Sequence, residues 1–63
     1  MNVGKNIRNL RLEHDMSMKE FAEKLGTTDS AICRWENGKA KLPVDMAIKI
    51  ADLFRIPLDE LVR

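Results

Sequence analysis

Hydrogen-bonding side chains gather in a short stretch near the middle of the chain, TTDSAICRWENGK, residues 27–39. If residues 28–36 form a helix, Ala31, Ile32 and Trp35 share an apolar face. The opposite face then presents Asp29, Ser30, Cys33 and Arg34. The guanidinium donates, the carboxylate accepts and the hydroxyl does both, so this face is equipped to recognise a partner by hydrogen bonds.

Covalent and metal chemistry have little support in the sequence. One Cys and one His cannot complete a four-ligand zinc site, and a single Cys cannot form a disulfide within the chain. No nucleophile with a neighbouring base and no phosphate-cradling loop is visible. We therefore expect no enzyme activity, no metal and no cofactor, and we interpret Cys33 as a reduced thiol, with redox sensing as the alternative.

Helical patterns cover the chain, and strand signals are absent. Val3, Ile7 and Leu10 predict a first helix that ends near His14 and Asp15. Ser17 with Glu20 has the form of a capping box at the start of a second helix, whose inward residues are Phe21, Ala22 and Leu25. Gly26 ends that helix, Thr28 caps the third and Gly38 ends it.

The last third of the chain predicts two more helical segments. Pro43 fits the first turn of a helix. The helix that begins there is predicted to have an apolar stripe of Val44, Ala47, Ile48, Ala51 and Phe54. After Pro57, the segment LDELV is short and offers Leu58, Leu61 and Val62. The fold class is therefore all-α, with residues 1–63 as a single domain.

Size and charge bound the function further. The 63 residues carry a net charge of +1, which is small for a nucleic-acid binder, although the positive excess lies in residues 1–41. No apolar run approaches the roughly 20 residues that span a bilayer, and the start MNVGKNIRNL lacks the apolar stretch of a signal peptide. We expect a cytoplasmic protein with no membrane partner.

Two short helices joined by a Gly-containing turn, at about residues 18–36, predict a helix-turn-helix. Ala22 is small where the helices approach, Gly26 supplies the bend, and Ile32 with Trp35 anchors the second helix. From Val3 to Val62 the chain resembles the lambda-repressor-like helix-turn-helix family, of the Cro/repressor or XRE type. The resemblance rests on the stretches IRNLR, FAEKLGTTDSAICRWENGK and FRIPLDELV.

The resemblance implies a compact five-helix DNA-binding domain whose third helix, about Thr28 to Glu36, enters the major groove. The implied base-reading residues are Thr28, Asp29, Ser30 and Arg34, with Cys33 near the groove edge. The implied phosphate contacts are Ser17, Asn37, Lys39 and Lys41. The resemblance also implies that Arg11 pairs with Glu36 and orients the helices.

Three residues depart from the family pattern. Met18 stands where many members have glutamine, which removes a polar side chain that often approaches the DNA backbone. Asp15 and Arg55 stand where glycine is frequent after a helix, so these turns either accept left-handed strain or use another geometry.

Elementary chemistry supports the same base-reading helix. The donors of Arg34 match O6 and N7 of guanine, a contact that discriminates by about 1–3 kcal/mol. Asp29 is favoured by the helix dipole and can accept from the cytosine N4 amine, so we expect it to contribute selectivity. Lys39 and Lys41 would add affinity without sequence preference, although a solvated loop is the simpler alternative.

The sequence thus predicts a transcriptional regulator that binds a double-stranded DNA operator, and we expect it to act as a repressor. In the resembling family the last segment often contributes to a homodimer, so Leu58, Leu61 and Val62 are candidate dimer contacts. Two copies would read half-sites about 34 Å apart. The alternative is a protein-interaction module, such as an antitoxin or a partner-controlled regulator, which the near-neutral charge and Asp29 favour.

Overall fold

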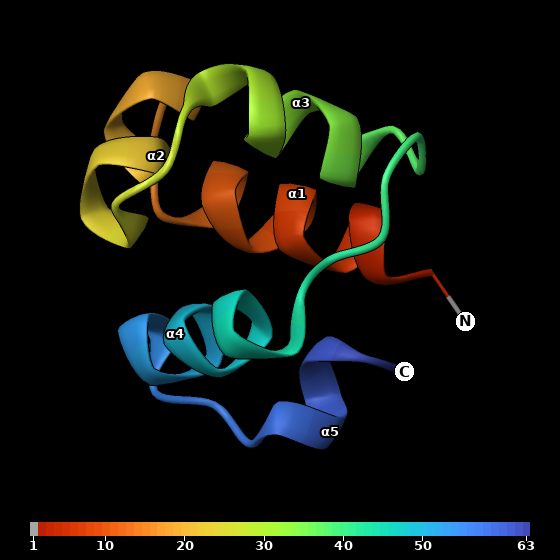
Figure 1. Ribbon diagram of the computed structural model, residues 1–63. Helices are drawn as coiled ribbons and strands as arrows, with labels where there is room; N and C mark the ends of the chain where they lie inside the picture. The colour runs from red at the N-terminus through yellow and green to blue at the C-terminus, as the bar shows by residue number, and fades with distance from the viewer. Residues whose placement is uncertain (1) are drawn as a thin grey trace.

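The computed structural model describes residues 2–63, and every regular element in this range is a helix (Figure 1). The five helices are α1 (Val3–Glu13), α2 (Met18–Leu25), α3 (Asp29–Glu36), α4 (Val44–Phe54) and α5 (Leu58–Leu61). The all-α, five-helix prediction is confirmed. None of these helices is long and apolar enough to cross a membrane.

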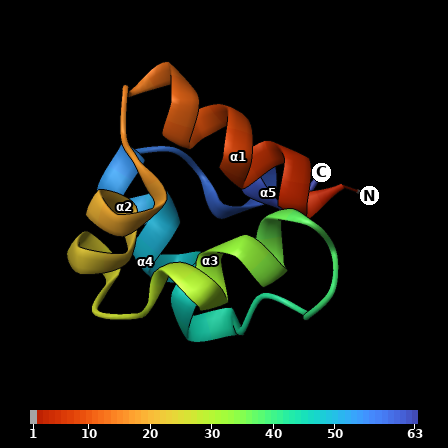
Figure 2. The same ribbon diagram turned by 90° about the horizontal axis from the view of Figure 1, so that it is seen from above.

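Helix α1 packs against α3 and α5, and α2 packs against both α3 and α4. In Figure 1, α2 and α3 lie on one side of α1, and α4 and α5 lie on the other. The view from above shows α3 running beside α1, with both ends of the described chain at the same edge of the molecule (Figure 2). The outer side of α3 is therefore a surface of the domain, while its inner side faces the core.

Side-chain caps start the two helices of the helix-turn-helix. The Ser17 hydroxyl accepts from the Glu20 amide at 3.0 Å, and the Thr28 hydroxyl accepts from the Ala31 amide at 3.2 Å. Each bond satisfies an amide that has no partner within its own helix. Only this half of the predicted capping box forms. Within residues 2–63, the Ser17 amide donates no hydrogen bond to the Glu20 carboxylate.

Four of the helices end in the same way, with one residue in the left-handed conformation. These residues are Asp15 (φ 54°), Gly26 (φ 73°), Gly38 (φ 71°) and Arg55 (φ 56°). The next amide then donates to the carbonyl five residues earlier, as in the 2.9 Å bond from Thr27 to Ala22. Asp15 and Arg55 therefore accept left-handed strain where glycine would carry none.

The core is built from all five helices. Its buried cluster comprises Ile7, Phe21, Ala22, Leu25, Ile32, Trp35, Ala47, Ile50 and Leu61. The predicted stripe of α4 was partly wrong, because Val44 and Ile48 are 72% and 46% exposed while Ile50 is fully buried. Apolar residues occupy more than one side of α4, so the helical period alone could not select the side that faces the core.

The first turn of α1 lies directly against the last turn of α3. A Cβ atom added to Gly4 would meet the backbone carbonyl oxygens of Trp35 and Glu36 at 2.6 Å. Backbone atoms cannot move aside as the end of a flexible side chain can. Gly4 therefore allows the two helices to approach more closely than any larger residue would.

A buried ion pair joins the same two helices. Arg11 Nε donates to Glu36 Oε2 at 2.8 Å and Arg11 Nη2 to Oε1 at 3.2 Å, while Nη1 donates to the Met16 carbonyl at 2.9 Å. Arg11 and Glu36 are 8% and 7% exposed. The two parallel bonds fix the carboxylate in the plane of the guanidinium, so the pair constrains the orientation of α3 relative to α1.

Asn6 fastens the end of the chain to α1. Its side-chain amide donates at 2.8 Å to the carbonyl oxygens of both Leu61 and Arg63. These carbonyls belong to the last residue of α5 and to the second residue after it, where helical partners run out. Asn6 thus helps to hold α5 over the core.

Gly4→Ala should destabilise the domain by about 1–3 kcal/mol, since the added methyl group meets rigid backbone. Helix propensity alone predicts the opposite sign, a gain of about 1 kcal/mol. Thermal unfolding followed by circular dichroism distinguishes the two, with Lys5→Ala in the same turn as the matched control. A rise in melting temperature for Gly4→Ala would contradict the close approach.

Breaking the buried pair one side at a time should cost about 3–5 kcal/mol, because each single change leaves a buried charge without its partner. Replacing both residues, Arg11→Met with Glu36→Leu, should cost much less than the sum of the two changes. Urea unfolding of the four proteins of this double-mutant cycle measures the coupling. Additive losses would show that the two side chains do not depend on each other.

Candidate nucleic-acid interface

α3 has one face in the core and one in solvent. Ile32 is fully buried and Trp35 is 9% exposed, so both serve as anchors. On the other side Asp29, Ser30 and Arg34 are exposed and Cys33 is partly buried. Because the helix packs only along its inner stripe, a rigid outer row of side chains remains available to a partner.

The outer row is not engaged by the rest of the molecule. Within residues 2–63, the side chains of Asp29, Ser30 and Arg34 make no hydrogen bond or ion pair. The two ion pairs of this range join Arg11 to Glu36 and Arg63 to Asp59. A bound partner would therefore compete only with water for these three side chains.

The hydroxyl groups of Ser17 and Thr28 mark the starts of α2 and α3 on the exposed surface. Both oxygens accept from the capped helix, which leaves each hydroxyl hydrogen free to donate to an acceptor outside the protein. A phosphate oxygen is such an acceptor. Capping and an outward contact are therefore compatible at both positions.

Asn37 is already engaged at the other end of α3. Its side-chain nitrogen donates to the Cys33 carbonyl at 2.9 Å and lies 3.3 Å from Cys33 Sγ. This bond satisfies one of the last carbonyls of the helix. The expected phosphate contact of Asn37 would require the side chain to share or exchange these bonds.

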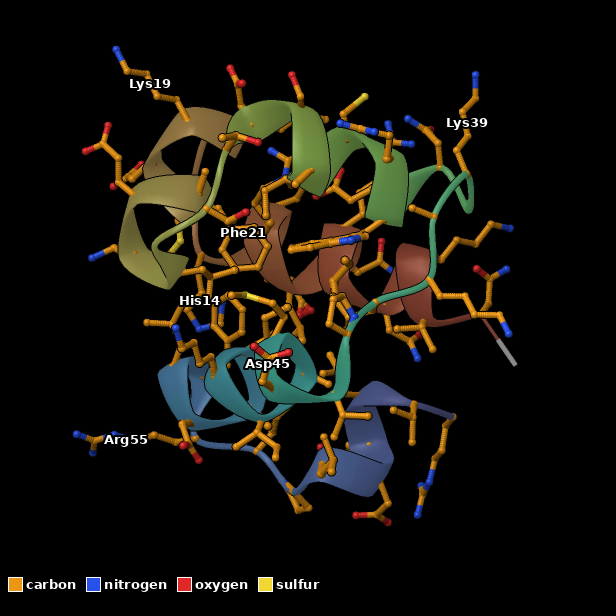
Figure 3. All side chains as sticks on the ribbon, in the orientation of Figure 1. His14, Lys19, Phe21, Lys39, Asp45 and Arg55 are labelled. Carbon is orange, nitrogen blue, oxygen red and sulfur yellow. The ribbon has the colours of Figure 1, made fainter. Side chains whose placement is uncertain are left out.

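Lysines lie at both ends of the α3 surface. Lys39 and Lys41 are exposed in the loop after α3, as the sequence pattern led us to expect. Lys19 was not among the residues singled out from the sequence, yet it extends to the same side of the molecule as Lys39, beyond the opposite end of α3 (Figure 3). Met18 beside it is partly buried and packs against the core. The inward assignment of Phe21 and Ala22 from the sequence already implied an outward Lys19 in the first turn, but not that Lys19 lies beside α3.

The candidate dimer contacts separate into two kinds. Leu61 is fully buried in the core of its own chain and offers no exposed side chain to a second copy, while a dimer contact through this segment stays a prediction. Leu58 is 40% exposed and Val62 is partly buried. The last helix thus uses one apolar residue to close the core and leaves others at the surface.

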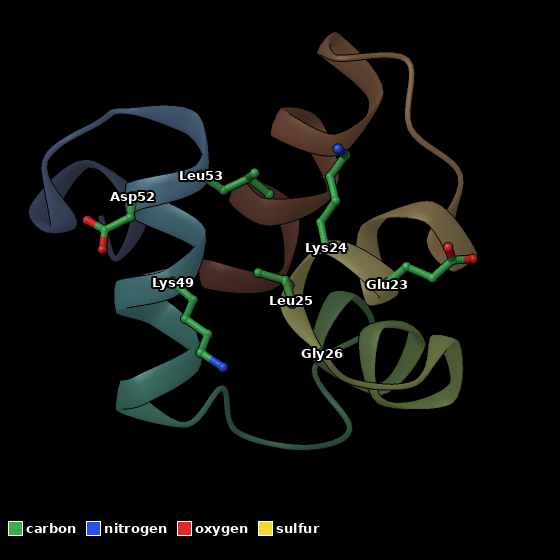
Figure 4. Close-up of a pocket in the computed structure, with 7 residues that line it drawn as sticks. All are labelled: Glu23, Lys24, Leu25, Gly26, Lys49, Asp52 and Leu53. Carbon is green, nitrogen blue, oxygen red and sulfur yellow. The ribbon is translucent and has the colours of Figure 1, made fainter.

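A hollow of about 550 Å³ between the end of α2 and α4 offers no match to an anion (Figure 4). Its charged residues are Glu23, Lys24, Lys49 and Asp52, two of each sign. Opposite charges at such close quarters largely cancel the local field. Lys39 and Lys41, which line a surface without acidic residues beside the end of α3, are a better match for phosphate.

Comparison with known proteins agrees with this arrangement. Residues 7–61 match the protein family described as Helix-turn-helix. Antitoxin PezA of Streptococcus pneumoniae serotype 4 is 32% identical over 60 residues, which make up 95% of this chain and 38% of the antitoxin. A protein of Pyrococcus furiosus, named as a proposed HTH-type transcriptional regulatory protein, is 34% identical over 55 residues, 87% of this chain and 18% of that protein.

A Pyrococcus horikoshii protein with the same description is 33% identical over 55 residues, again 87% of this chain and 18% of that protein. The chain therefore spans less than two fifths of the length of these relatives. No solved structure gives a significant match. The family match runs from Ile7 in α1 to Leu61 in α5 and includes the whole of α2 and α3. The chain belongs to the lambda-repressor-like, XRE-type helix-turn-helix family.

Proposed function

We propose that the protein is a sequence-specific regulator of transcription that inserts α3 into the major groove of duplex DNA. The observation that carries this proposal is the free outer row of α3, where Asp29, Ser30 and Arg34 are exposed and unpaired among the described residues. A major groove about 12 Å wide admits an α-helix, and its base edges offer the donors and acceptors that such a row can read.

Within this proposal Arg34 reads guanine through two parallel hydrogen bonds. Asp29 accepts from a cytosine amine, and its charge repels phosphates when the helix lies on an unmatched sequence. Thr28 and Ser30 add shorter contacts at the start of the helix, and Cys33 lies at the edge of the row. The buried pair of Arg11 and Glu36 supports the row from behind, because it fixes the angle of α3.

Contacts to the phosphates position the domain on the duplex. The proposed donors are Ser17 and the lysines at the two ends of α3, namely Lys19, Lys39 and Lys41, with Asn37 contributing if it exchanges its internal bonds. These contacts carry affinity and salt dependence but no sequence information. The net charge of +1 is compatible with this role, since the positive excess lies in residues 1–41, which contain all four of these donors.

We propose that the regulator acts as a repressor. A domain bound in the major groove within a promoter would compete with polymerase for the same DNA. The homodimer expected from the sequence has its own test. Two copies should protect two half-sites about 34 Å apart, whereas one copy should protect a single short site.

A second candidate function is partner-controlled regulation, as in an antitoxin. It is favoured by the similarity to antitoxin PezA, which covers 95% of this chain. The same DNA-binding domain can serve both functions, because the rest of the antitoxin lies outside the matched region. Recovery of a stable protein partner together with an absence of duplex binding would favour an interaction module without DNA binding.

Arg34→Ala should lower affinity for the preferred duplex by about 10- to 100-fold, the equivalent of losing about 1–3 kcal/mol of base recognition. Selection of bound duplexes from a random pool should recover one shared sequence for the original protein. For the variant, the preference should relax at one base pair. Ser30→Ala, a smaller change on the same face, provides the comparison.

Unchanged preference at every base pair after Arg34→Ala would remove this residue from the reading surface. Failure of the original protein to enrich any sequence would contradict sequence-specific binding altogether.

Lys19→Ala should weaken duplex binding nearly equally on all sequences and reduce the slope of log affinity against log salt by about 1, since one phosphate contact is lost. Fluorescence anisotropy titrations at several salt concentrations measure this slope. Lys49→Ala is the matched control, because Lys49 is an exposed helical lysine on α4, on the side of α1 away from α3 (Figure 1). Equal slopes for the two variants would exclude a phosphate contact by Lys19.

A further inference from the structure

An apolar groove lies where the start of α1, the loop after α3, the start of α4 and the end of the chain meet. It has a volume of about 600 Å³ and includes the apolar residues Val3, Leu42, Val44, Ala47, Leu58 and Val62. Sites that hold a ligand or peptide side chains typically enclose about 300–1,000 Å³. The groove is therefore large enough to hold several side chains of a partner.

Two of the four large apolar side chains that the fold leaves exposed in residues 2–63 line this groove. Val44 is 72% exposed and Leu58 is 40% exposed, and they line it together although they stand 14 positions apart in the sequence. The first turn of α4 and the start of α5 bring them together. A continuous apolar surface of this kind marks an interaction site more often than scattered exposed residues do.

The charge at the groove indicates what kind of partner fits. Lys39 and Lys41 line it and no acidic residue does. The nearest acidic residues in sequence, Asp45, Asp59 and Glu60, are exposed but lie outside the lining. Carboxylates on the partner would pair with the two lysines. The acidic residues beside the groove would repel those carboxylates elsewhere, so they can lie only at the lysine end.

A second copy is a poorer match for the same reason. In a symmetric dimer each copy presents the same surface, so the groove lining of one copy offers the other lysines and no carboxylate. Carboxylates from Asp45, Asp59 or Glu60 would have to come from outside the lining. A partner that carries acidic residues within its own apolar segment supplies them directly.

We infer that the groove binds an acidic amphipathic segment of another protein. Bulky apolar side chains of the segment fill the space beside Val44 and Leu58, and its carboxylates contact Lys39 and Lys41. These two lysines are also phosphate contacts in the proposed function. To the extent that this function holds, the segment and the duplex compete for the same charges, and binding of the partner releases DNA.

The probe is a random 12-residue peptide library displayed on phage and selected against the full chain. Enriched peptides should combine at least two Asp or Glu residues with spaced Leu, Ile or Phe residues. Synthetic copies of them should bind at least tenfold more weakly to the double variant Val44→Gln/Leu58→Gln. Ile48→Gln, which removes an exposed apolar side chain of α4 outside the groove, should bind as the original does.

Competition is measured with the same peptides. Added peptide should displace a fluorescent duplex from the original protein but not from the double variant, and circular dichroism verifies that all variants remain folded. If the original protein binds peptides in the groove but no duplex, the groove stands and the proposed function fails. If the original protein binds duplex but enriches no acidic peptide, the proposed function stands and the inference about the groove fails. The inference also fails if peptide binding is the same in the double variant. Sedimentation as a dimer that the double variant abolishes would also overturn it, since a second copy would then fill the groove.

Discussion

The close packing of α1 against the last turn of α3 is the constraint on which the rest of the structure depends. Gly4 lets the backbones approach, and Arg11 holds the side chain of Glu36 through two hydrogen bonds. These two interactions hold the last turn of α3 against α1, while Ile32 and Trp35 pack its inner side into the core. The base reading proposed for α3 requires such a rigid support, because small rotations of the helix would misplace every side chain on its outer face.

In a domain with a small core, the buried pair orients α3 without adding much to the stability. A buried ion pair contributes little net stability compared with apolar residues of the same volume, but it accepts only one geometry. The apolar cluster of the five helices supplies cohesion, and the pair adds orientation. Nearer the start of α1, the Asn6 side chain also fixes an orientation, because it donates two hydrogen bonds to carbonyls at the end of the chain.

Two different surfaces meet at the loop after α3. One is the polar face of α3, and the other is the apolar groove formed with α4 and α5. Lys39 and Lys41 belong to the border between them. With this layout a protein partner could control DNA binding without a change in the fold, because it would contact the same two lysines that we propose bind phosphate.

Local sequence signals were sufficient for the helices and their ends. Apolar spacing, the caps at Ser17 and Thr28, and the glycines at positions 26 and 38 depend on neighbours within a few residues, so the all-α fold and the helix-turn-helix could be predicted. The sequence also indicated which side of α3 faces outward, because Ile32 and Trp35 leave one polar side. Tertiary packing decided the rest. Five features depend on residues far apart in the chain, which only the assembled helices bring together. They are the buried side of α4, the burial of Leu61, the close approach at Gly4, the position of Lys19 beside α3 and the contact of Val44 and Leu58 with one groove.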